Sequence, residues 1–111
     1  YQEGKGPQAA VYIIDSLQGR AIEDYAHNVF TNWKLGNKER DDGVLFIIAF
    51  KDRKMRIEVG QGLEGSLTDY TSKQIINKVT PYFKKKDFDG GVAIGVKEIL
   101  KVISAPEAVQ M

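Results

Sequence analysis

Four acidic residues near the middle of the chain are the best candidates for chemistry. They are Asp41, Asp42, Glu64 and Asp69. Asp41 and Asp42 precede a run of apolar residues, and Glu64 lies in a glycine-rich segment, residues 60–65. Carboxylate oxygens and backbone carbonyls, which such a segment exposes, are the ligands that Ca²⁺ and Mg²⁺ prefer. If the four side chains converge, they indicate a site for a divalent cation.

A purely structural role accounts for the same residues. Asp41 and Asp42 are common turn residues, Asp69 suits the start of a helix, and Glu64 suits a solvated loop. The pattern is not an EF-hand, which takes its ligands from one loop of about twelve residues. Spacing alone leaves the structural and the metal-binding interpretations open.

The glycine-rich segment also matches G-x-G-x-x-G, the fingerprint of dinucleotide-binding folds. In those folds the preceding strand is buried on both faces, whereas residues 55–59 alternate between apolar and charged. The acidic residue expected about twenty positions later would be Asp87 or Asp89, and both fall in a turn. Glu64 would set a carboxylate beside the pyrophosphate. We therefore expect no dinucleotide cofactor.

A predicted β-hairpin is the element that would bring the acidic residues together. Residues 44–50 form a continuous apolar run, which is typical of a buried strand. Residues 55–59 have the alternation of a half-exposed partner strand, and a polar turn lies between the two. With Val44 roughly opposite Gly60, the acidic pair before the first strand would lie beside the glycine-rich segment.

The rest of the chain supplies one further strand and three helices. Residues 9–14 predict a strand, and residues 22–33 carry their apolar side chains on one helical face. A second helix should start at Thr68 or Asp69 and be kinked or restarted at Pro81. The last helix follows the turn at residues 87–91. The order βαββαα, with a right-handed crossover between the first two strands, predicts an α/β fold.

The remaining polar residues predict no catalytic centre. His27 is the only histidine and lies off the apolar face of its helix, which argues against a Ser-His-Asp triad or a zinc site. Trp33 lies on that face and is expected in the core. Asp15 and Ser16 end the first strand, at the other end of the sheet from the acidic residues. The lysines at 84–86 suit a helix C-terminus, where cations complement the dipole.

Composition narrows the function classes. A chain of 111 residues fits one domain. Its 16 Lys and Arg against 15 Asp and Glu, a net charge of +1, do not indicate a nucleic-acid-binding surface. Without cysteine there is no disulfide or thiolate chemistry. No apolar run approaches the roughly 20 residues of a membrane span, and a first residue that is not methionine predicts a processed or trimmed product.

Several short motifs, in consistent order and spacing, resemble the TPM domain, which is named after a thylakoid lumen protein, a photosystem II accessory protein and a nematode receptor regulator. The matching segments are Ile22–Ala26, Trp33–Gly36, Asp41–Leu45, Arg56–Gly60, Gly62–Gly65, Leu67–Asp69 and Asp87–Gly91. The resemblance covers roughly residues 8–103. It implies a single TPM-like domain over residues 1–111, with a lead-in loop at 1–8 and a tail at 105–111. Family members usually carry a helix before the first strand, and this sequence starts where that helix would be ending, so we expect either a trimmed fragment without the helix or a sheet that is covered differently.

The resemblance implies a three-layer α/β/α sandwich around a short mixed sheet, and binding of Ca²⁺ or Mg²⁺ through Asp41, Asp42, Glu64 and Asp69. Family members divide in function. Plant lumenal members are described as acid phosphatases, the animal member is an auxiliary receptor subunit, and many bacterial members are exported, some with a membrane tether. We therefore expect an exported, cation-binding, non-catalytic accessory module of an envelope or membrane complex, with phosphate monoester hydrolysis as the alternative.

Overall fold

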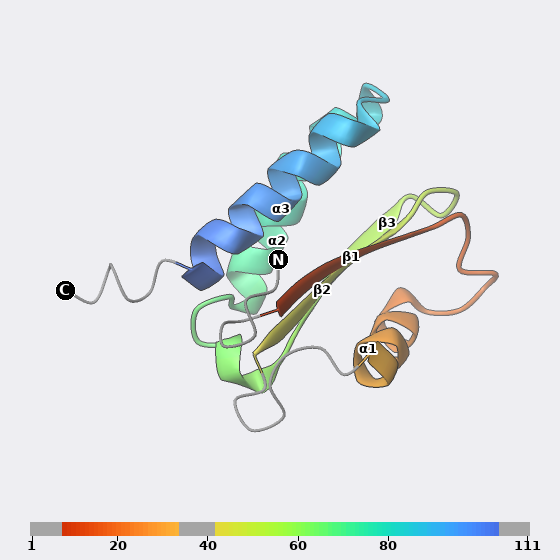
Figure 1. Cartoon of the computed structure of the whole chain (residues 1–111). Coiled ribbons are helices and arrows are strands. Elements are labelled where there is room, and N and C mark those ends of the chain that lie inside the picture. The colour runs from red at the N-terminus through yellow and green to blue at the C-terminus, as the bar shows by residue number, and fades with distance from the viewer. Residues whose placement is uncertain (1–7, 34–41, 105–111) are drawn as a thin grey trace. The chain divides into compact units, whose positions relative to one another are not determined.

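The computed structural model of the chain describes residues 8–33 and 42–104 (Figure 1). The boundary between two compact units falls between Leu63 and Glu64. The elements in chain order are β1 (Gln8–Ile14), α1 (Ile22–Trp33), β2 (Gly43–Ala49), β3 (Lys54–Val59), a 3₁₀ turn (Gln61–Leu63), α2 (Asp69–Lys84) and α3 (Phe88–Ser104). The α/β class and the order βαββαα are confirmed. In the described ranges no helix is long and apolar enough to cross a membrane.

The first unit contains a three-stranded mixed sheet in the order β1-β2-β3, with β1 parallel and β3 antiparallel to β2. The predicted hairpin is present, but its register differs from the expected one. Val44 lies opposite Val59 rather than Gly60. The reason is that Phe50 leaves the strand and begins the turn, where its carbonyl accepts a hydrogen bond from the N–H of Arg53 at 3.1 Å.

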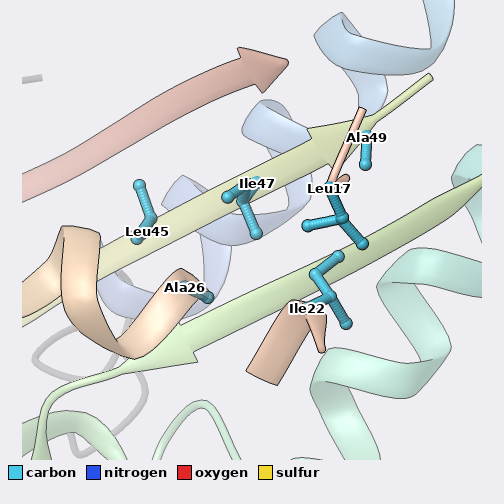
Figure 2. Packing of buried hydrophobic residues seen from close by; sticks show 6 residues of the cluster. All are labelled: Leu17, Ile22, Ala26, Leu45, Ile47 and Ala49. Atoms are coloured by element: carbon cyan, nitrogen blue, oxygen red, sulfur yellow. The ribbon is translucent and has the colours of Figure 1, made fainter. Parts of the chain in front are cut away.

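One face of the sheet packs against α1. Figure 2 shows the apolar cluster between them. Alternate residues of β2 contribute to it, and the first two turns of α1 contribute Ile22 and Ala26. Its buried members are Leu17, Ile22, Ala26, Leu45, Ile47 and Ala49. Every residue of β2 is buried, as the uninterrupted apolar run predicts.

Trp33 departs from the prediction that it lies in the core. It is the last residue of α1 and is 45% exposed. Its ring packs on Tyr12 of β1 with a centroid separation of 4.9 Å and an interplanar angle of 55°. A position at the end of the helix lets the indole cover an apolar neighbour with one face while the other meets water.

The second unit is a helical hairpin of α2 and α3. Thr68 is the N-cap of α2, where its hydroxyl accepts a hydrogen bond from the N–H of Thr71 at 3.1 Å. The helix then continues through Pro81 to Lys84, so of the two outcomes predicted at Pro81, a kink or a restart, the restart does not occur. The segment predicted as a turn at 87–91 is mostly the first turn of α3, capped by Asp87, whose carboxylate accepts from the N–H of Gly90 at 3.0 Å.

The two helices approach closely beside their connection. An ideal Cβ built on Gly91 would lie only 2.6 Å from Cδ1 of the Phe83 ring, so a hydrogen at this position is what the packing needs. The Phe83 ring also meets Phe88 edge-on, with centroids 5.5 Å apart. These contacts tie the end of α2 to the start of α3.

Candidate functional site

Asp42 lies where β2 begins, between the ends of the two neighbouring strands. Its carbonyl oxygen accepts a hydrogen bond from the N–H of Gln8 at 3.2 Å. The carbonyl of the next residue, Gly43, accepts one from the N–H of Gly60 at 2.8 Å. Asp42 is 6% exposed, and no other acidic residue of the described ranges is buried. Because carboxylates are rarely buried without strong partners, this position is the most constrained of the acidic candidates that the structure describes.

The loop after β3 is folded back on itself next to Asp42. The N–H of Leu63 donates to the carbonyl of Gly60 at 2.9 Å and closes a 3₁₀ turn. Leu63 is 8% exposed and anchors this turn, whereas Gln61 and Gly62 are exposed. The predicted approach of the glycine-rich loop to the start of β2 is therefore confirmed at the level of the backbone, through the bond between Gly60 and Gly43.

Of the other acidic candidates, the structure describes Glu64 and Asp69. Asp41 falls outside the described residues. Glu64 is exposed at the start of the second unit, and Asp69 is the exposed first residue of α2, where a carboxylate complements the helix dipole. Within residues 8–33 and 42–104, no group of three or more acidic, histidine or cysteine side chains is placed to hold a metal ion. The convergence of all four carboxylates stays a prediction.

The G-x-G-x-x-G segment is built differently from a dinucleotide fingerprint. The strand before it, β3, runs antiparallel to β2. A 3₁₀ turn follows, and α2 begins only at Asp69, beyond the last glycine of the motif. The phosphate-binding version needs a parallel strand that leads directly into a helix N-terminus.

Asp52 has a structural role that no motif in the sequence predicts. It lies in the turn between β2 and β3, and its Oδ2 accepts a hydrogen bond from the backbone N–H of Leu17 at 2.6 Å. The bond joins the hairpin turn to the loop between β1 and α1. An aspartate in a polar turn was the only signal available, and it is too common to predict a partner 35 positions away.

Glu58 contacts one basic group on its own strand and His27 on α1. Its Oε1 accepts from Nε of Arg56 at 3.0 Å, and its Oε2 lies 3.4 Å from Nδ1 of His27 on α1. The Glu58 side chain is 16% exposed, while that of His27 is 70% exposed. His27 therefore makes a polar contact with β3 at the exposed surface of α1.

Two tyrosines form the other polar cluster of the first unit. Burial raises the pKa of Tyr25 above its ordinary value of 10.0, and a hydrogen bond with Tyr12 raises it further. The guanidinium of Arg20, 5.4 Å from the centre of the Tyr25 ring, acts in the opposite direction. The cluster anchors α1 on β1 and lies at the same face as the apolar cluster of Figure 2.

Comparison with known proteins identifies the fold and the family. A model of the TPM domain matches residues 1–102. The structure is similar to the N-terminal domain of a protein from P. gingivalis, solved by NMR, with a TM-score of 0.79 and 28% identity over 87% of this chain and 62% of that chain. It is also similar to the BA42 protein of the psychrophilic bacterium Bizionia argentinensis, with a TM-score of 0.74 and 23% identity over 86% of this chain and 66% of that chain.

The match thus spans less than two thirds of either solved chain. Among curated proteins no sequence matches. The TPM model nevertheless accounts for almost the whole length described above, and the fold agrees with both solved structures. The chain belongs to the TPM domain family.

Proposed function

We propose that this TPM domain binds a divalent cation, Ca²⁺ or Mg²⁺, through Asp41, Asp42, Glu64 and Asp69. The observation that carries the proposal is the burial of Asp42 at the start of β2, directly beside the loop that Gly60 begins. A buried carboxylate next to a loop with exposed backbone supplies hard oxygen donors in one place, which is the chemistry these ions require. Membership of the TPM family supports the same assignment.

We further propose that the domain is exported and acts as a non-catalytic accessory module of an envelope or membrane-associated complex. A bound cation would neutralise the acidic residues and stiffen the loop that follows β3. This is a role in which the ion is structural, and it needs no nucleophile or phosphate clamp. The domain would then present an ordered loop to a partner protein.

A titration by NMR tests the cation site. On addition of Ca²⁺ or Mg²⁺, the largest amide shifts are expected at residues 41–43 and 62–69, and they should saturate. Asp42→Asn should weaken binding by about tenfold or more, a loss of ~1.4 kcal/mol or greater. Asp24→Asn, at an exposed position in the first turn of α1, is the control and should bind as the parent does. The proposal would be wrong if the two variants bound the cation equally well, or if millimolar Ca²⁺ or Mg²⁺ caused no amide shifts in the parent protein.

Hydrolysis of a chromogenic phosphate monoester separates the accessory role from the alternative, a metal-dependent phosphatase. A catalytic ion would polarise a phosphoryl oxygen and activate water. The accessory role predicts no turnover above background, with or without chelator. Turnover that chelator abolishes and Asp42→Asn reduces would assign the phosphatase activity instead and leave the cation site intact.

A further inference from the structure

The outer edge of β1 is open within the described part of the chain. β1 is the first strand of the sheet, and only β2 pairs with it (Figure 1). The N–H of Gln8 donates to Asp42 at 3.2 Å, and the carbonyl of Ile14 accepts from Phe50 at 3.1 Å. In a parallel ladder every second residue bonds to the neighbouring strand. Gln8, Ala10, Tyr12 and Ile14 therefore face β2, and the backbone groups of Ala9, Val11 and Ile13 point to the open edge.

The side chains at this edge are apolar and partly exposed. Val11 is 37% exposed and Ile13 is 45% exposed, and both lie on the face of β1 opposite α1. No residue from Gln8 to Ile14 is charged. Edge strands are normally guarded by charged side chains or proline, because their unpaired backbone groups template pairing with another chain.

The other edge of the same sheet has that protection. β3 carries Lys54, Arg56 and Glu58 at alternate positions. The contrast within one sheet singles out β1 as the strand suited to pairing.

We propose that β1 pairs with β1 of a second copy of this chain, antiparallel and about a two-fold axis at Val11. In this register Val11 lies opposite its symmetry mate, and Ala9 lies opposite Ile13 of the second copy. These are the positions whose backbone groups point outward, so each facing pair can exchange both of its hydrogen bonds. The large side chain of Ile13 meets the small one of Ala9, the two valines form a β-branched pair, and no charges oppose one another.

The self-complementarity of the strand is what favours a second copy over an unrelated strand. A two-fold pairing uses the whole open edge of both copies and closes the assembly as a dimer. The two sheets would form one continuous sheet whose outer edges are both β3, with its charged side chains.

Amide hydrogen exchange of the unmodified protein gives the sharpest test. At high protein concentration, the amides of Val11 and Ile13 should become protected, whereas on dilution they should exchange quickly. The amides of Ala10, Tyr12 and Ile14, which face β2, should stay protected at both concentrations. Fast exchange of Val11 and Ile13 throughout a range from about 10 µM to about 1 mM, where weak dimers are populated, would overturn the proposal. Protection that does not depend on concentration would do so too, and would assign the edge to another segment or ligand.

Variants at Val11 test the same register by sedimentation equilibrium. Val11→Lys places two cations opposite each other on the axis and should give a monomer over the whole concentration range. Val11→Pro removes only the outward N–H and leaves the bonds to β2, so it should also give a folded monomer. Val11→Thr keeps a β-branched side chain and Tyr70→Lys changes an exposed residue of α2, and both should dimerise as the parent does. A dimer that survives in Val11→Lys and Val11→Pro, with native amide spectra, would place the interface elsewhere.

Discussion

The carboxylate of Asp52 accepts a hydrogen bond from the backbone N–H of Leu17 at 2.6 Å. The two residues come from different connections of the first unit, the β2–β3 turn and the loop between β1 and α1. Leu17 is 2% exposed and belongs to the apolar cluster under α1. The bond therefore satisfies a backbone donor beside the core and fixes where the chain turns into α1.

We expect Asp52→Ala to lower the free energy of unfolding by about 1.5–3 kcal/mol, since it removes a charge-assisted bond and leaves a partly buried N–H without its acceptor. Asp52→Asn keeps an acceptor oxygen and should lose about half as much. Urea denaturation measures both. Asp15→Ala, at an exposed residue just after β1, is the control and should change stability by less than about 0.5 kcal/mol. Equal losses in Asp52→Ala and Asp15→Ala would mean that the bond contributes nothing measurable.

Gly91 is expected to be the least replaceable glycine of the described ranges. In Gly91→Ala the new methyl would overlap the ring of Phe83, with 2.6 Å to Cδ1, and neither helix can move apart without losing the Phe83–Phe88 contact. We expect a loss of about 1–3 kcal/mol by urea denaturation, the usual cost of overpacking. Gly65→Ala is the matched control, because nothing lies within 4 Å of the added methyl. It should be neutral or slightly stabilising, and a similar loss in both variants would contradict the steric explanation.

Lys86 lies just beyond the C-terminus of α2 and has a backbone conformation that suits glycine. Its φ is +63°, and the N–H groups of Lys86 and Asp87 bond back to Phe83 at 3.0 Å and Tyr82 at 2.8 Å, as in a Schellman motif. Lys86→Gly should raise the free energy of unfolding by about 0.5 kcal/mol, because relief of left-handed strain exceeds the added entropy of the unfolded chain. Lys85→Gly, where φ is −89°, should instead lower it by about 0.5–1 kcal/mol. Thermal unfolding of the two variants measures these changes. A change in stability of the same sign in both would show that the left-handed conformation of Lys86 is not the cause.

The elements of this fold could be predicted where a short pattern determines them. The apolar run of β2 and the periodic apolar residues of α1 each depend on neighbours a few positions away. The hairpin register could not be predicted in this way. It depends on whether Phe50 continues the strand or enters the turn, and an apolar residue fits either position. The exposure of Trp33 could not be predicted for a similar reason. Helical periodicity shows which face of the helix Trp33 occupies, but not that the helix ends at this residue.

For the candidate site too, part of the arrangement could be predicted from the sequence and part could not. That the loop after β3 returns to the start of β2 follows from the hairpin, and the bond between Gly60 and Gly43 confirms it. That Asp42 is buried while Asp69 is exposed does not follow from spacing, because the two residues look alike in the sequence. The contact of Asp52 with Leu17 depends on the placement of two loops, which no local pattern encodes.

The raised pKa of Tyr25 predicts a loss of stability at alkaline pH. Burial, and then the hydrogen bond with Tyr12, favour the neutral phenol in the folded state, so the unfolded chain releases this proton at a lower pH. The contribution is fully present below the unfolded value of about 10 and is lost as pH rises through the folded pKa. Urea denaturation between pH about 9 and about 11 should therefore show a decline that is smaller in Tyr25→Phe. Tyr12→Phe removes the hydrogen bond but keeps the burial of Tyr25, which is the larger cause, and should retain most of the decline. An identical pH profile for Tyr25→Phe and the parent would show that Tyr25 is not its source.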